Sequence, residues 1–114
     1  MTRKQKREMV RKGVKQHARA AKALAGRIWE LAEPPMREVG SARLLGDFLG
    51  ERGFKVDFCL PALPTAFKAT AGKGKPAIGI LGEYDALPDC GLRKGTYGHG
   101  CGHNLFGVAS AVGA

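Results

Sequence analysis

The chain has 114 residues, of which 44% are hydrophobic, and it carries a formal net charge of +9. A chain of this length can bury one modest core, so these 114 residues cannot comfortably hold two domains. Nearly all of the charge lies at one end: residues 1–22 contain 9 Lys or Arg and a single acid, Glu8, whereas residues 23–114 are close to neutral. The positive charge is therefore a property of one segment.

Residues 1–22 form a basic N-terminal extension. This segment lacks the apolar run of a secretory signal, and it lacks the serines of a mitochondrial presequence, because the first serine is Ser41. No aromatic residue and no known nucleic-acid-binding module precedes Trp29. We therefore expect a solvated helical extension, with no membrane partner and with nucleic acid disfavoured as a partner.

The three cysteines are Cys59, Cys90 and Cys101. Their odd number and wide spacing do not fit a disulfide framework. A reducing compartment fits better, and we expect a cytoplasmic protein.

Two helices are predicted before residue 54. Apolar or small residues recur at steps of three and four from Val14 to Ala32, which predicts a helix from the basic segment to about Leu31. The two prolines that follow end it. A second helix has one apolar side, and Gly53 suits a left-handed C-terminal cap. The residues of that side are Val39, Leu44, Leu45, Phe48 and Leu49.

Three strands and a further helix are predicted after residue 53. Residues 54–58 alternate between apolar and charged, which is typical of a half-buried strand, and residues 66–71 form a second short strand. In the third, residues 77–84, the run Ala77–Leu81 is apolar without alternation, which predicts a strand buried on both faces of an α/β sheet. After a polar loop over 89–98, Asn104 is expected to cap the further helix.

Two acids, Glu83 and Asp85, follow the third predicted strand. In an extended segment they project to one side, with Tyr84 on the other. The end of such a strand is where α/β proteins commonly place their chemistry. A plain surface turn over DALP is an equally good interpretation of these residues alone.

The segment GHGCGHN places His99, Cys101 and His103 at alternate positions. If its backbone is extended, the three side chains share one face, and the glycines leave room for an ion. A thiolate and imidazoles suit zinc, and cobalt, nickel and manganese are compatible. Two alternatives remain. The segment can be a loop without ligands, or it can form a self-contained structural zinc site together with Cys90. The spacing of the four residues in such a site differs from that of common zinc modules.

The motifs GILGEYDALP and GHGCGHN, in this order, resemble the paired motifs of the zinc-dependent amidohydrolases in the aminoacylase and carboxypeptidase G superfamily, especially its aminobenzoyl-glutamate hydrolase branch. The upstream segment IWELAEPPMREVGSARLLGDFLGERGFKV is similar to that family's two opening helices and first strand. The resemblance implies an α/β fold in which residues 23–114 are the N-terminal part of a three-layer α/β/α zinc-exopeptidase-like catalytic domain, with two helices, three strands and the start of a further helix.

The resemblance also implies a site with two divalent metal ions, Zn²⁺ first and Mn²⁺ or Co²⁺ as alternatives. It makes Cys101 and His103 metal ligands and gives Asp85 a catalytic role in orienting a ligand. His99 and Glu83 are supporting residues or possible ligands. No substrate-binding residue is assigned.

The implied reaction is hydrolysis of the amide bond of N-acyl or N-aroyl amino acids, such as aminobenzoyl-glutamate, or of related dipeptides. The family's lid domain implies a dimer or other homo-oligomer. The family's proton-shuttling glutamate and remaining ligands are not among these residues, so we expect the 114 residues alone to be inactive. Two rival functions stay open: a basic-tailed nucleic-acid-binding protein and a small structural zinc-binding protein.

Overall fold

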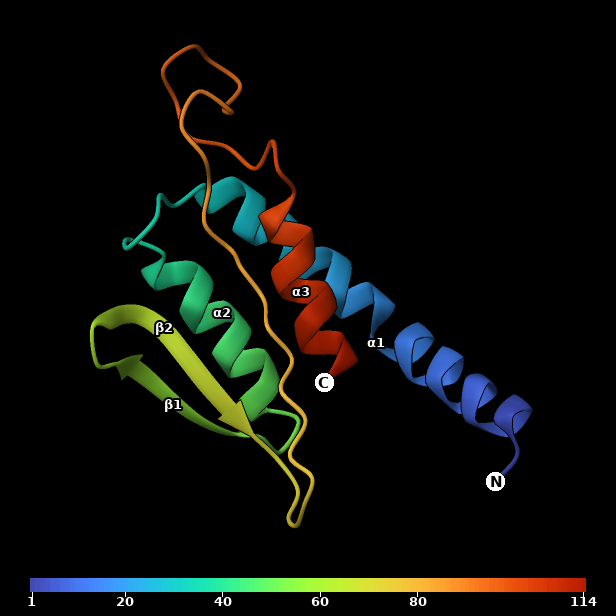
Figure 1. The fold of residues 1–114 in the computed structure, drawn as a ribbon. Helices are drawn as coiled ribbons and strands as arrows, with labels where there is room; N and C mark the ends of the chain where they lie inside the picture. The colour runs from blue at the N-terminus through green and yellow to red at the C-terminus, as the bar shows by residue number, and fades with distance from the viewer.

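The computed structural model describes residues 1–114, with three helices and one two-stranded sheet in the order α1 (Arg3–Leu31), α2 (Val39–Gly50), β1 (Lys55–Leu60), β2 (Leu63–Thr70) and α3 (His103–Gly113). In Figure 1, α2 and α3 lie beside the C-terminal half of α1, and the β1–β2 hairpin lies beyond α2. The N-terminal half of α1 projects from this body. None of the helices has both the length and the apolarity needed to cross a membrane.

Helix α1 is defined by signals at both of its ends. At the start, the Thr2 hydroxyl accepts from the Gln5 backbone N–H and the Gln5 side chain accepts from the Thr2 N–H, which is a capping box. At the end, Ala32 adopts a left-handed conformation and its N–H donates to the Ile28 carbonyl. The predicted helix to about Leu31 is confirmed.

The core lies where the three helices meet. Helix α2 has the predicted apolar side, and its free N-terminal N–H groups are satisfied by Glu33, whose carboxylate accepts from the backbone of Gly40 and Ser41 at 2.8 Å each. Burial of these apolar side chains supplies most of the stability of such a domain. The buried cluster comprises Leu24, Ala25, Ile28, Leu45, Phe48, Leu49 and Val108.

The first two predicted strands are confirmed as β1 and β2, which pair antiparallel with Phe58 opposite Phe67. The predicted alternation holds, because Phe54 and Val56 pack against the core cluster. Gly46 of α2 allows the close approach of this hairpin, since a Cβ there would lie 2.2 Å from the Phe58 ring.

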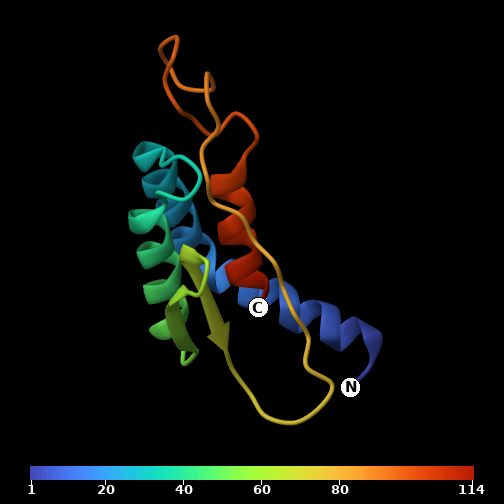
Figure 2. The ribbon, with the colours of Figure 1, turned by 60° about the vertical axis from the view of Figure 1, so that its left-hand side comes forward.

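The prediction of a third strand over residues 77–84, buried on both faces, is wrong. These residues form no strand, and Ile78 and Leu81 are 85% and 78% exposed. The segment runs extended alongside α3 (Figure 2), but no strand pairs with it on either side. A central strand depends on neighbours for its hydrogen bonds and its burial, which apolarity alone does not provide. The α/β class is confirmed, whereas the three-layer architecture stays a prediction.

Helix α3 begins two residues earlier than predicted and without the predicted cap. Gly102 is its N-cap, in a left-handed conformation with φ of 79°, and no side chain caps the helix. Asn104 instead lies in the first turn, where its buried side-chain amide donates to the Ala25 carbonyl of α1 at 3.1 Å. The Asn104 side chain therefore bonds to α1 and does not cap its own helix.

Candidate functional site

The extended segment that carries Glu83 and Asp85 is held at one end by α3 and at the other by the loop between α1 and α2. The Ser110 hydroxyl of α3 donates to the Leu81 carbonyl at 2.7 Å, and the Ala86 N–H donates to the Glu33 carbonyl at 2.8 Å. Gly107 allows α3 to lie directly on the segment, because a Cβ there would come within 2.8 Å of the Glu83 carbonyl oxygen. The two acids are therefore fixed by backbone contacts although the segment belongs to no sheet.

The second part of the site comes from the chain after the 89–98 loop. Leu87 and Gly98 form a two-residue antiparallel bridge, with N–O distances of 2.9 and 3.0 Å, which closes this loop. A Cβ at Gly98 would collide with the Cys90 backbone, so the close crossing requires glycine. The crossing brings the start of α3 back to the acidic segment.

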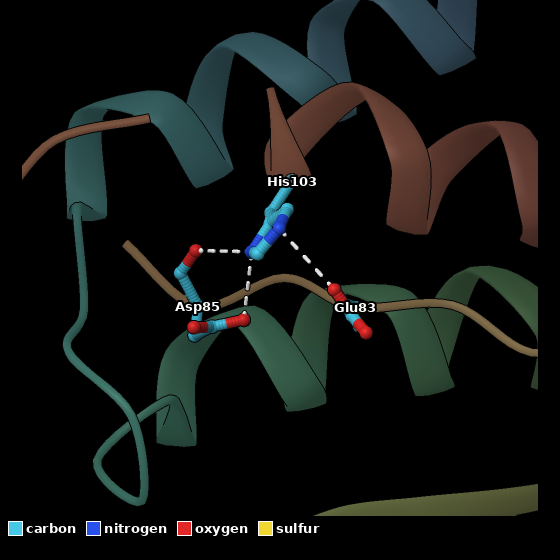
Figure 3. Close-up of side chains that lie close together, drawn as sticks. All are labelled: Glu83, Asp85 and His103. Atoms are coloured by element: carbon cyan, nitrogen blue, oxygen red, sulfur yellow. Dashed lines mark hydrogen bonds and ion pairs between the residues drawn. The ribbon is translucent and has the colours of Figure 1, made fainter. Parts of the chain in front are cut away.

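Three predicted site residues meet at this point: Glu83, Asp85 and His103 (Figure 3). Nδ1 of His103 lies 2.8 Å from Oδ1 of Asp85 and 3.1 Å from its carbonyl oxygen, and Nε2 lies 3.2 Å from Oε2 of Glu83. The His103 and Asp85 side chains are 15% and 22% exposed, whereas Glu83 is 52% exposed. The imidazole ring thus lies between two carboxylates, one sheltered and one open to solvent.

The side chains of Glu83, Tyr84 and Asp85 alternate in direction, as the sequence predicts for an extended segment. Glu83 and Asp85 both face His103, while Tyr84 points away and donates its hydroxyl to the Thr65 carbonyl at 2.7 Å. Burial, followed by the negative charges of Glu38 and Glu33, raises the pKa of Tyr84 to about 12. Tyr84 therefore stays neutral and ties the acidic segment to β2.

The geometry and chemistry of the cluster fit a divalent metal ion. Nδ1 donates to the two Asp85 oxygens, which are acceptors, and Nε2, which faces the Glu83 carboxylate, is the nitrogen that a metal ion would bind. Two ligand atoms about 2.1 Å from one tetrahedral zinc ion lie roughly 3.4 Å apart, and Nε2 of His103 and Oε2 of Glu83 are 3.2 Å apart. A carboxylate that accepts from Nδ1–H is the usual support of a metal-binding histidine, and Asp85 occupies that position.

His99 does not join this cluster, so the predicted common face of His99, Cys101 and His103 is wrong. The backbone turns between them: the Gly102 N–H donates to the His99 carbonyl at 2.9 Å, and α3 begins directly afterwards. The His99 ring is 8% exposed, and its Nε2 donates to the Ile28 carbonyl at 3.1 Å. Burial lowers the pKa of His99, and the hydrogen bond to Ile28 opposes this effect.

The cysteines also lie outside the three-residue cluster. Cys59, Cys90 and Cys101 are all free and exposed, and the only group of three or more potential ligand residues with atoms within 4.8 Å of one another is Glu83, Asp85 and His103. The four-residue zinc site with Cys90 is not assembled. Metal binding by Cys101 and His103 and catalysis by Asp85 stay predictions.

Glu33 supports the site, and its role has only a partial signal in the sequence. Its carboxylate caps α2 and its carbonyl holds Ala86, so one residue joins α1, α2 and the acidic segment. The sequence signal for the cap is that Glu33 precedes Gly40 of α2 by seven residues, with Pro34 and Pro35 between them. The second contact involves a residue more than fifty positions away and has no local signal.

The chain is similar to two known hydrolases. It is 40% identical over 101 residues to one of the subunits of p-aminobenzoyl-glutamate hydrolase from Escherichia coli (strain K12), across 80% of this chain and 21% of the relative. It is 44% identical over 61 residues to Xaa-Arg dipeptidase of Mus musculus, across 45% of this chain and 12% of the relative. The chain thus spans about a fifth and about an eighth of these relatives' lengths. No family model matches the chain.

These similarities confirm the resemblance inferred from the two motifs. The chain belongs to the family of amidohydrolases and peptidases that contains both relatives, the aminoacylase and carboxypeptidase G superfamily. Both relatives are named as hydrolases of small amide-linked substrates.

Proposed function

We propose that this chain supplies part of the metal centre of an amidohydrolase that cleaves the amide bond of N-acyl or N-aroyl amino acids or of related dipeptides. Aminobenzoyl-glutamate is the first substrate to test, because the relative that matches most of the chain is named for it. The observation that carries the proposal is the His103 ring held between Asp85 and Glu83 at 2.8 and 3.2 Å.

Each residue of the cluster has a distinct role in this proposal. Asp85 accepts the Nδ1 proton of His103, which fixes the ring and its tautomer and directs Nε2 outward. His103 and Cys101 are proposed as ligands of a divalent ion, zinc before manganese or cobalt, with Glu83 as a further ligand. Cys101 lies outside the group of ligand atoms within 4.8 Å of one another, so its thiolate must move toward Nε2 to join them.

A divalent ion in such a site supplies Lewis acidity, which makes water a nucleophile near neutral pH and polarises a carbonyl. The protein's contribution is to keep the imidazole ring and the two carboxylates in place before the substrate arrives. Backbone contacts from Ser110, Glu33 and Gly107 provide this rigidity. A two-metal centre and a dimer formed through a lid domain are the corresponding proposals for the whole enzyme.

The test is to express the longest reading frame that includes this chain and to assay release of aminobenzoate from aminobenzoyl-glutamate with added Zn²⁺, Mn²⁺ or Co²⁺. A dipeptide with C-terminal arginine serves as the second substrate. His103→Ala should abolish activity, whereas His17→Ala, on α1 and away from the cluster, should retain it. Unchanged activity in His103→Ala would contradict the proposal.

The cysteines separate the proposal from a structural zinc site. Cys101→Ala should remove activity and bound metal, whereas Cys59→Ala and Cys90→Ala should leave both unchanged. A structural site built on Cys90 and Cys101 predicts instead that both variants lose zinc and unfold together. Metal content and circular dichroism of the purified variants distinguish these outcomes.

A further inference from the structure

The N-terminal part of α1 carries a charged surface that the proposed enzyme does not use. All nine Lys and Arg residues of positions 1–22 are exposed, and none of them forms an ion pair. The helix is continuous from Arg3 onward, and this half projects from the body in both views (Figures 1 and 2). The cations therefore face solvent with only one carboxylate, that of Glu8, among them.

Six of the nine cations form a row along one side of the helix. Successive members are three or four residues apart, which is the spacing of neighbours on one helical face. At 1.5 Å per residue the row is roughly 27 Å long. We name it the basic stripe, and its members are Lys4, Arg7, Arg11, Lys15, Arg19 and Lys22.

We propose that the basic stripe binds the phosphates of double-stranded nucleic acid without reading its sequence. A duplex presents about one negative charge per 1.7 Å of its axis, so a straight row of cations can neutralise several phosphates at once. Lys and Arg are the usual partners of such phosphates. Residues 1–28 contain no Phe, Tyr or Trp on which unpaired bases could stack, and the ring of His17 packs against Phe48, which favours a duplex over a single strand.

The same helix is poorly suited to an anionic membrane. Membrane-surface helices place large apolar residues such as Leu, Phe and Trp on one side, whereas residues 1–22 offer only Met1, Met9, Val10 and Val14 as larger apolar side chains. The sequence alone disfavours nucleic acid, because it shows no binding module. The structure adds that the cations lie exposed along one continuous helix, which the composition does not reveal.

The test is to titrate the 114-residue chain with a short duplex DNA of random sequence at several salt concentrations. If the six stripe cations each neutralise a phosphate, the logarithm of the affinity falls with the logarithm of the salt concentration with a slope of roughly −5. Glutamine at Lys4, Arg7, Arg11 and Lys15 should make this slope shallower by about 4. Glutamine also preserves helix propensity, which circular dichroism can verify.

The matched control removes the same four charges from exposed loops of the body, with glutamine at Lys73, Lys75, Arg93 and Lys94. This variant should bind as the wild type does. Glu8→Gln, which removes the single acid near the stripe, should tighten binding.

Three results would overturn the proposal: no binding or salt-independent binding of the duplex, equal loss in the stripe and loop variants, or binding to phosphatidylserine vesicles without binding to the duplex. None of these measurements depends on hydrolase activity, so the basic stripe and the metal centre are tested separately.

Discussion

The two halves of α1 share one helix but differ in what keeps them helical. Residues 24–28 contribute Leu24, Ala25 and Ile28 to the core, so their helical conformation is stabilised by burial against α2 and α3. Residues 3–22 have no buried residue and consist mainly of Lys, Arg, Ala and Gln, which are strong helix formers. The comparison teaches that one secondary structure can serve two purposes, packing in one half and presentation of charge in the other.

The largest effect that tests this comparison is loss of a core side chain. Ile28 is fully buried, and Ile28→Ala should lower the free energy of unfolding by about 3 kcal/mol, since the deleted methyl groups leave a cavity. Val14→Ala in the projecting half should change it by less than about 0.5 kcal/mol, because Val14 is 49% exposed. Urea unfolding followed by circular dichroism measures both. Equal destabilisation by the two variants would show that the two halves form one packed unit.

The features predicted correctly from the sequence are those with a local signal. The three-to-four spacing predicts α1 and α2, and alternation predicts β1, because each pattern needs only the residues of its own element. The prediction for residues 77–84 fails because a central strand also needs neighbouring strands, and none pairs with it. The same reason applies to Asn104, whose side chain is drawn to the Ala25 carbonyl across the core.

The candidate site is predictable in part. The alternation of Glu83 and Asp85 correctly places both acids on one side, since an extended backbone fixes that relation. The grouping of His99 with His103 fails, because the chain turns over Gly100 and Cys101 and then enters α3 at the left-handed Gly102. Glycine adopts positive and negative φ angles about equally well, so the sequence does not predict which backbone conformation Gly102 takes.

The next largest effect concerns the proposed metal centre, whose residues Glu83, Asp85 and His103 all lie in the body. Asp85→Asn should weaken Zn²⁺ affinity by about 10 to 100-fold, because the ring of His103 loses the carboxylate that orients it. Competition with a colorimetric chelator measures this on the 114-residue chain. Asp47→Asn, which removes an exposed carboxylate of α2, is the control and should leave the affinity unchanged.

If Asp85→Asn retains full zinc affinity, then Asp85 does not support the ligand. Zinc binding that persists in His103→Ala would go further and place the metal elsewhere in the chain. Either result would contradict the proposed metal centre at Glu83, Asp85 and His103.

A smaller effect is expected at Glu33, which joins the packed half of α1 to α2. Glu33→Ala removes the acceptor of two N–H groups and the Ser41 hydroxyl, and should cost about 1–2 kcal/mol of stability. The matched change in the projecting half, Glu8→Ala, should cost nothing measurable because Glu8 is exposed and unpaired. Thermal unfolding of the two variants compares an acid that caps a buried helix start with one that faces water. A neutral Glu33→Ala would show that water replaces the carboxylate at the start of α2.

The last effect is the titration of Tyr84, which links β2 to the acidic segment of the body and changes stability only at alkaline pH. Its pKa is raised from 10.0 to about 12 by burial and by the charges of Glu38 and Glu33, so the folded state favours the neutral phenol. This contribution to stability is complete below pH 10 and is lost as the pH rises toward 12. In a Tyr97→Phe background, tyrosinate absorbance should therefore appear near pH 12 in the folded chain and near pH 10 in urea. Absorbance that appears near pH 10 in both would mean that Tyr84 is solvated and that the acidic segment is free of β2. The positions of Glu83 and Asp85 would then depend on Glu33 and α3 alone.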